Sequence, residues 1–224
     1  MSLPGEKEPI SGLDFFDPDQ PVISSGRTRP TLCILPRGNW VKKRQYDFPA
    51  LTTSDGLSRL IDFSLEYFGT RIGVTGLRRN RFLLTAHSGG GKALVSVLSH
   101  VDPDELHVFD ALYWSAEHLV AWARRHIEAD VATIKAGGSP NGALRVFYLP
   151  GMGTEDQSLA VQSRIVSDIS AHAGPGNLLA RFYRVEKTTV DHLQIPRRLG
   201  WQLLRSAGAD IVNAVSPRSR RHAQ

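Results

Sequence analysis

One short stretch near the middle of the chain, Ala86-His87-Ser88-Gly89-Gly90, could present a serine as a nucleophile. The pattern small-x-nucleophile-x-small has a steric cause, because the nucleophile sits in a strained turn and the residues two positions on either side approach each other. The apolar run FLLTA before the turn and KALVSVL after it predict the strand and the helix that such a turn needs. We therefore predict that Ser88 is a nucleophile on a strand-to-helix elbow.

The same glycines could instead cradle a phosphate, because Gly91-Lys92 resembles the end of a phosphate-binding loop. That loop requires a glycine five residues before Gly91 and a Ser or Thr after the lysine to hold magnesium. Ala86 and Ala93 occupy these positions. The sequence thus favours the elbow, predicts Lys92 as a solvated residue in the first helical turn, and leaves nucleotide binding as a third hypothesis.

A serine hydroxyl needs a base to take its proton, and His192 is the candidate for that base. It lies in TTVDHLQIP, after the last predicted strand and before the closing helix. In elbow-type chains the histidine follows the nucleophile and the acid in the sequence. None of the other seven histidines stands in such a place.

The acid that would orient His192 has several candidates. Asp110 ends the apolar run VFDALYW, and an aspartate there would be costly to bury without a partner. Glu155 and Asp156 follow a later strand, where the acid also commonly stands. Asp191 beside the histidine is typical of a turn former. We take Asp110 as the acid and keep Asp156 as the alternative.

These candidates need a scaffold, and hydrophobic patterning predicts one of alternating strands and helices. Such alternation is typical of an α/β fold, a mostly parallel sheet with helices on both faces. Ligands bind beyond the carboxyl ends of such strands, where Ser88, Asp110 and His192 all stand. The predicted strands cover residues 31–35, 82–86, 106–112, 144–149 and 179–185. The predicted helices cover residues 56–68, 90–100, 116–135, 158–172 and 196–212.

Length and composition predict one principal domain. With 224 residues, 41% of them apolar, the chain can bury a sizeable core. We expect an irregular arm over residues 1–29, the α/β domain over 30–214 and a basic flexible tail over 215–224. Cys33 is the only cysteine, so no disulfide and no thiolate metal site is expected, and its apolar surroundings predict a buried side chain.

Charge and segment patterns narrow the expected partners. The net charge is +5, but the basic runs come without a zinc finger or an aromatic-rich sheet motif, which argues against nucleic-acid binding. No apolar run reaches membrane-spanning length, and no secretory signal begins the chain. A cytoplasmic protein is expected as written, or a secreted or periplasmic one if an upstream segment is missing. Aromatic residues could line a substrate pocket near the serine: Trp40, Tyr46, Phe48, Tyr113, Trp114 and Trp122.

The elbow AHSGGGKAL, the strand VFDALYW and the late Asp-His pair together resemble the α/β-hydrolase superfamily. Within it, the His-Ser-Gly-Gly elbow and the Phe-Asp-Ala-Leu-Tyr strand are similar to a group of poorly characterised bacterial hydrolase-like proteins. The resemblance covers about residues 30–212. It implies Ser88 as nucleophile, His192 as base, Asp110 as acid and the Gly89 amide as one oxyanion donor, with no cofactor.

The chain departs from this family before the elbow. There the family carries two or three strands and a His-Gly loop with the second oxyanion donor, and no His-Gly stands here. LCILPRGNW is either the third strand, with residues 37–39 as an unusual oxyanion loop, or the fourth, which leaves the oxyanion strand missing. The first hypothesis is a serine hydrolase that cleaves a small ester or amide through an acyl-serine. The alternative is a shortened, non-catalytic hydrolase-like domain that binds a ligand or a partner.

Overall fold

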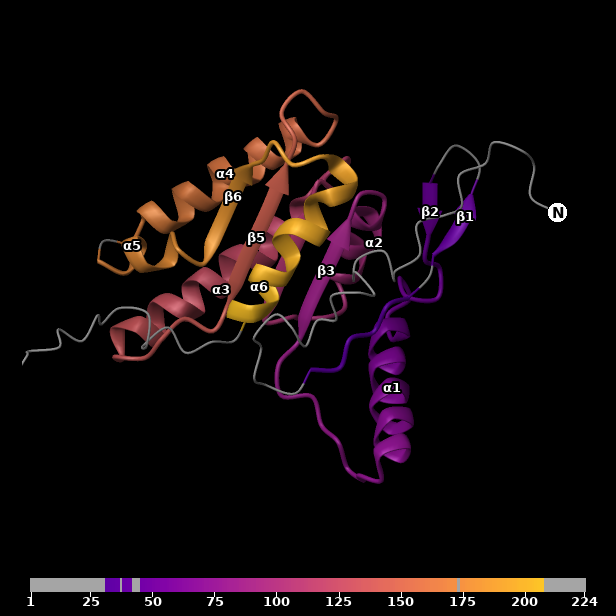
Figure 1. Cartoon of the computed structure of the whole chain (residues 1–224). Coiled ribbons are helices and arrows are strands. Elements are labelled where there is room, and N and C mark those ends of the chain that lie inside the picture. Colours follow the sequence, from indigo (N-terminus) through magenta and orange to yellow (C-terminus); the bar gives the residue numbers. More distant parts are fainter. Residues whose placement is uncertain (1–30, 37, 42–44, 173, 208–224) are drawn as a thin grey trace, which may run out of the picture.

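A computed structural model describes residues 31–36, 38–41, 45–172 and 174–207 of the chain. The predicted arm and the predicted basic tail lie outside the described residues. At the centre of the fold is a four-stranded sheet in which neighbouring strands are all parallel (Figure 1). The order of the strands in the sheet equals their order in the chain. The strands are β3 (Leu83–His87), β4 (Glu105–Phe109), β5 (Ala143–Tyr148) and β6 (Tyr183–Lys187).

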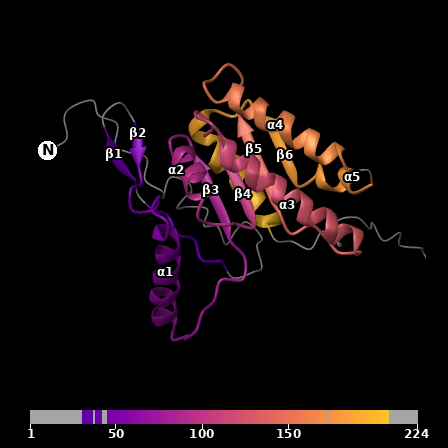
Figure 2. The same ribbon diagram turned by 180° about the vertical axis from the view of Figure 1, so that it is seen from behind.

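Helices separate these strands in the chain, so the predicted α/β class is confirmed. In order they are α2 (Gly90–Val97), α3 (Glu117–Lys135), α4 (Glu155–Ser170) and the short α5 (Pro175–Leu179). A 3₁₀ turn (His192–Gln194), a π-helical turn (Pro196–Gly200) and α6 (Trp201–Ser206) follow β6. Figures 1 and 2 show α3 and α4 on one side of the sheet and α6 on the other.

One face of the sheet is apolar because every second strand residue is a hydrophobe. The register aligns Leu84, Leu106 and Leu144 across three strands and, one step further along, Ala86, Val108 and Val146. These side chains form one core with residues from α2, α3 and α4. β4 is buried along its whole length, as expected of an inner strand of a parallel sheet.

The opposite face changes character along the strands. Thr85, His107 and Arg145 are aligned in its first half, and a second row pairs Phe109 with Phe147, whose rings stack at 6.1 Å. The π-helical turn lies over this aromatic half, where a methyl group on Gly200 would contact the Phe109 ring at 3.5 Å. The row nearer the carboxyl ends of the strands also contains His87, which is paired with Phe109 and directly precedes Ser88.

Two boundaries differ from the prediction for local reasons. The strand predicted from residue 179 begins only at Tyr183, because Pro175 starts a helical turn that extends to Leu179. The strand predicted over 106–112 ends at Phe109, since Asp110 adopts a left-handed backbone that ends the extended run. The elbow strand, its helix and α3 lie close to their predicted positions.

The part of the chain before the elbow departs most from expectation. Residues 31–36 form no regular element, so the predicted strand over 31–35 is wrong. Cys33 is exposed rather than buried. A small antiparallel hairpin, β1 (Asn39–Val41) with β2 (Gln45–Asp47), stands where a loop was expected. Among the described residues β3 pairs only with β4 and therefore forms an edge of the sheet.

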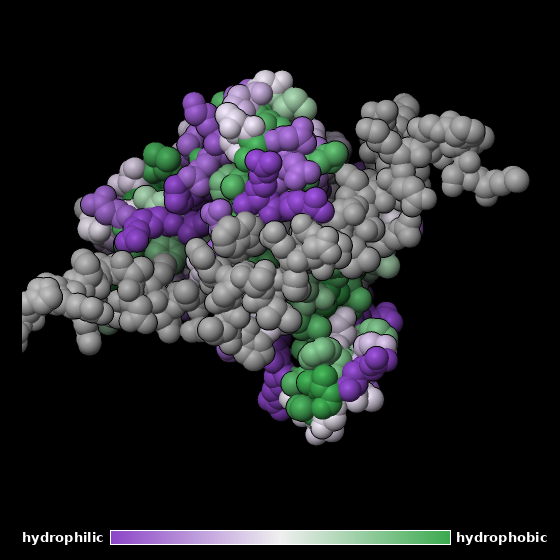
Figure 3. All heavy atoms as spheres, in the orientation of Figure 1, coloured by the Kyte–Doolittle hydropathy of each residue, from purple (hydrophilic) through white to green (hydrophobic). Residues whose placement is uncertain are grey.

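Helix α1 (Gly56–Ile72) continues beyond the predicted end at residue 68 and is only partly covered. Leu57 and Ile61 pack with Val97 of α2. On its outward side, large apolar side chains are exposed near the lower end of the helix (Figure 3). They are Phe63, Tyr67, Phe68 and Ile72, with Val74 just beyond the helix.

Candidate active site

Ser88 occupies the sharp turn between β3 and α2, as the elbow pattern predicts. Its backbone is left-handed, with φ of 51°, a conformation that few residues other than glycine adopt. Its amide donates to the carbonyl of Phe109 at 3.1 Å, which ties the turn to β4. A methyl group on Gly90 would contact the Ala86 methyl at 3.8 Å, so the two small positions do approach each other.

Gly91 is the tightest position of this turn. A Cβ atom there would lie 1.8 Å from the carbonyl oxygen of Ala111, so the start of α2 presses against the loop that follows β4. Its amide donates to the carbonyl of Ser88 at 3.1 Å. The third glycine of the motif therefore sets the distance between the serine turn and the Asp110 loop.

Asp110 stands at the carboxyl end of β4, next to the serine turn, and is fully buried. Its backbone is also left-handed, with φ of 47°, and its amide donates to Phe147 at 2.7 Å. One carboxylate oxygen accepts hydrogen bonds from the Thr154 hydroxyl and from the Leu149 amide. The other accepts from Nδ1 of His192 at 2.6 Å. The predicted acid and base are thus in direct contact.

His192 lies in the 3₁₀ turn after β6. Asp191 caps that turn by accepting from the amide of Leu193 at 3.0 Å, so it is the turn former that the sequence indicated. Because the Asp110 carboxylate can only accept, Nδ1 of His192 carries a proton and Nε2 of the neutral ring is left as a proton acceptor. The ring is therefore held in the tautomer that a general base requires.

The charge of Asp110 is set by opposing effects. Burial raises the pKa of its carboxyl, but hydrogen bonds from His192, Thr154 and Leu149 and the charge of His192 outweigh burial, so the pKa lies below its usual range. The carboxylate thus stays ionised and can stabilise a protonated His192 ring. This balance is typical of the acid in a nucleophile–base–acid triad.

His87 links the elbow directly to the base. Its ring lies 4.7 Å from the His192 ring between centroids, and its Nε2 donates to the His192 backbone carbonyl at 2.9 Å. Burial, and then the nearby charge of His192, lower the pKa of His87 to about 4. His87 is therefore neutral near pH 7 and can hold the His192 turn against the elbow.

Tyr113 reaches the serine from the loop after Asp110. Its hydroxyl lies beside the side chain of Ser88. Burial and the charge of Asp110 raise the pKa of Tyr113, so the phenol remains protonated. The described residues form no hydrogen bond between Ser88 and His192, and the neighbour of the Ser88 side chain is the Tyr113 hydroxyl.

The structure separates the remaining candidates. Asp156 is exposed in the first turn of α4, and among the described carboxylates it is Asp110, not Asp156, that accepts from Nδ1 of His192. Glu155 accepts from the Gly151 amide at 2.7 Å and acts locally. Lys92 is exposed in the first turn of α2, as predicted. In the part of the chain that is described, no backbone hydrogen bond uses the Gly89 amide.

Three neighbours of the site were not singled out as site residues from the sequence. Thr154 precedes α4, and its hydroxyl reaches Asp110. Tyr113 was expected only as a pocket aromatic, and His87 only as part of the elbow. Trp122, also expected as a pocket aromatic, does not reach the serine: it is fully buried, and its indole N–H donates to the carbonyl of Pro103 at 2.9 Å.

No cluster of three or more metal-ligating side chains occurs within the described ranges. The described helices also include none that is long and apolar enough to cross a bilayer. Comparison of the chain with protein-family models, with curated proteins and with solved structures found no match.

Proposed function

We propose that this protein is a serine hydrolase that cleaves a small ester or amide through an acyl-serine intermediate. The observation that carries the proposal is the Asp110–His192 pair, whose atoms lie 2.6 Å apart beside the strained Ser88 turn. Ser88 and Asp110 follow the adjacent strands β3 and β4, and the turn after β6 brings His192 into contact with Asp110. The scaffold is then an α/β-hydrolase-like domain.

In the proposed reaction, Ser88 turns from Tyr113 toward Nε2 of His192, which accepts the hydroxyl proton. Oγ forms a bond to the substrate carbonyl carbon, and the leaving group departs with the proton that His192 returns. Water then attacks the acyl carbon while His192 takes a proton from it, the bond from that carbon to Oγ breaks, and His192 returns the proton to Oγ as the acid product leaves. Asp110 keeps the ring oriented and stabilises its charge throughout.

The oxyanion needs at least two donors, and the proposal assigns them as follows. The Gly89 amide follows the nucleophile directly, which is the usual place for one donor. The Tyr113 hydroxyl is the other donor, because it is protonated, adjacent to Ser88 and carried by a buried loop. Each such donor typically contributes about 10²–10³-fold to the rate.

A non-catalytic hydrolase-like domain is the second candidate, favoured by one observation. β3 is an edge strand among the described residues, so no strand beside it supplies a backbone amide to the oxyanion. A ligand- or partner-binding domain would retain the Ser88 turn without turnover. Nucleotide binding is the third candidate and lacks a hydroxyl for magnesium at Ala93.

Labelling with a fluorophosphonate, read by intact mass, tests the first candidate against the second. We expect one label per chain, no label on Ser88→Ala, and a loss of at least about 10³-fold in labelling rate for His192→Ala. The matched controls are Ser99→Ala and His118→Ala. Both residues are exposed; Ser99 lies just after α2, and His118 lies in the first turn of α3. If the folded wild-type chain takes up no label, the proposal that it is a serine hydrolase is refuted.

A further inference from the structure

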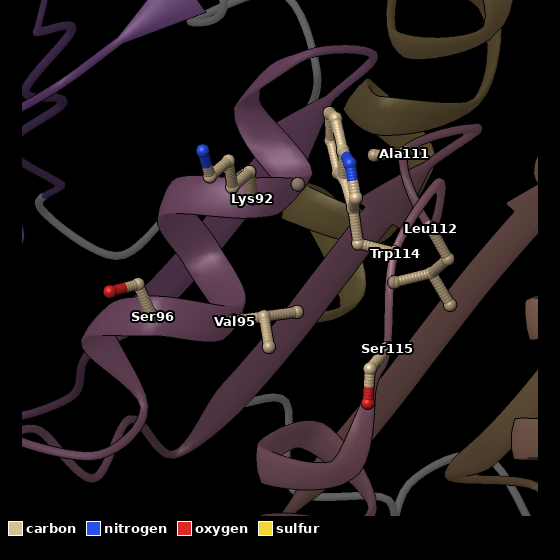
Figure 4. Close-up of a pocket in the computed structure, with 8 residues that line it drawn as sticks. Lys92, Val95, Ser96, Ala111, Leu112, Trp114 and Ser115 are labelled. Atoms are coloured by element: carbon tan, nitrogen blue, oxygen red, sulfur yellow. The ribbon is translucent and has the colours of Figure 1, made fainter.

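A pocket of about 160 Å³ lies between the first turns of α2 and the loop after Asp110 (Figure 4). From α2 it is lined by Gly91, Val95 and Ser96, together with the stem of Lys92. The other wall is made by Ala111, Leu112, Trp114 and Ser115. Apolar surface predominates in it, and both walls begin within three residues of a proposed catalytic residue.

The view of the pocket shows how it is built. Val95 points from α2 toward the loop, and the Trp114 ring stands across from the helix (Figure 4). The ammonium group of Lys92 points away from Trp114, so its charge does not enter the space. Ala111 and Leu112 are almost fully buried and form a rigid floor, whereas Trp114 is 42% exposed and forms an open rim.

The volume and position of the pocket limit which chemical groups it can bind. An apolar cavity of about 150 Å³ in another protein stays dry and binds benzene, so this pocket suits one aromatic ring or a branched alkyl group. Along α2, Val95 lies roughly 7–8 Å beyond Gly90, which follows the Ser88 turn, given a rise of about 1.5 Å per residue. A group seated beside Val95 would therefore need a spacer of a few atoms to the carbonyl at Ser88.

We infer that this pocket binds an apolar ring of the substrate, joined by a short flexible spacer to the carbonyl that Ser88 attacks. The inference rests on the proposed function and names its substrate class: aryl-alkanoyl esters or amides. The loop after β4 would then serve two purposes. Tyr113 on its inner side meets the serine, and Trp114 on its outer side meets the bound ring.

The test compares hydrolysis of 4-nitrophenyl 4-phenylbutanoate with that of 4-nitrophenyl acetate. We expect the wild type to prefer the phenylbutanoate by at least about tenfold in kcat/KM, because even one missing methylene in an apolar pocket changes this ratio by about 10–200-fold. Val95→Phe fills the pocket and should lower the ratio at least tenfold. Trp114→Ala removes one wall and should lower it about three- to tenfold.

Val166→Phe is the matched control, since Val166 is exposed on α4 and should leave the ratio unchanged. A ratio near one in the wild type, or one that neither pocket variant changes, overturns the pocket while fluorophosphonate labelling of Ser88 still upholds the hydrolase. Absence of both labelling and ester cleavage overturns the hydrolase, and the pocket inference falls with it. Should Val95→Phe fail to fold, the partly exposed Trp114 supplies the decisive variant.

Discussion

The contact between Gly91 and Ala111 predicts that two adjacent glycines respond in opposite ways to alanine. At Gly91 the added methyl would lie 1.8 Å from a backbone oxygen and must move out to at least 3.0 Å. At Gly90 the same methyl meets only the Ala86 methyl, at the ordinary contact distance of 3.8 Å. The two variants therefore differ only in which wall the methyl faces.

The magnitudes follow from these distances. Overpacking a methyl group against the backbone destabilises the fold by about 1–3 kcal/mol. The higher helix propensity of alanine relative to glycine offsets up to about 1 kcal/mol of this. Gly91→Ala should thus lower the free energy of unfolding by about 1–2 kcal/mol, or Tm by roughly 2–8 °C for a chain of this length. Gly90→Ala should be neutral or stabilising by up to about 1 kcal/mol.

Catalysis should separate the two variants further. The shift at Ala111 is transmitted to Asp110, its chain neighbour, and a displacement of about 1 Å at a reacting group can cost roughly 10²-fold in rate. Urea unfolding followed by circular dichroism and the rate of fluorophosphonate labelling measure both effects. If Gly91→Ala matches Gly90→Ala in stability and labels at the wild-type rate, α2 does not press against the Asp110 loop.

The remaining predictions use the same two assays. Ser88→Gly should be about 1 kcal/mol more stable than Ser88→Ala, because glycine adopts the left-handed backbone without strain and alanine does not. Equal urea midpoints for the two variants would show that the backbone at this position is not strained. Asp110→Asn should slow labelling about 10³–10⁴-fold, whereas the exposed Asp156→Asn should not slow it, and equal effects would remove Asp110 from the triad. Tyr113→Phe should slow labelling about 10²-fold with wild-type stability, and an unchanged rate would exclude the hydroxyl as an oxyanion donor. The pKa of His87 is about 4 in the folded chain, and its ordinary value is 6.5. Between pH 4 and 6.5 the His87 ring is therefore protonated in the unfolded chain but neutral in the folded one. Stability should therefore fall by up to about 3 kcal/mol as the pH drops from 6.5 to 4, and His87→Gln, which keeps a donor to His192, should lose that part of the pH dependence in urea titrations. If the free energy of unfolding of the variant depends on pH as that of the wild type does, a group other than His87 causes the pH dependence.

Two parts of the site could be predicted from the sequence: the turn, which depends on neighbouring residues, and the acid, whose burial is indicated by the apolar residues around it. The Ser88 turn is specified by small residues within five positions, between a strand and a helix that both formed. Asp110 was preferred over Asp156 because an aspartate inside an apolar run must have partners, and it is fully buried with three of them. Both arguments use only a short segment of sequence, although the partners of Asp110 lie 39 to 82 residues away from it in the chain.

Other features depend on contacts that a single sequence does not display. Thr154 and Tyr113 reach the site because loops from different strand ends converge, which periodicity cannot indicate. The apolar run at residues 31–35 is compatible with a strand, yet a run forms a strand only by pairing, and this one does not pair with the edge strand β3. The exposure of Cys33 has the same origin.

The strand order of the sheet has a consequence for how the molecule is made. Because β4, β5 and β6 each pair with the strand that precedes them in the chain, the sheet can grow in the direction of synthesis, with one helical crossover to close at each step. Ser88 stands on the first strand of that series, and His192 follows the last. The nucleophile is thus in place long before its base, and reactivity toward a fluorophosphonate would report that the chain has folded through β6.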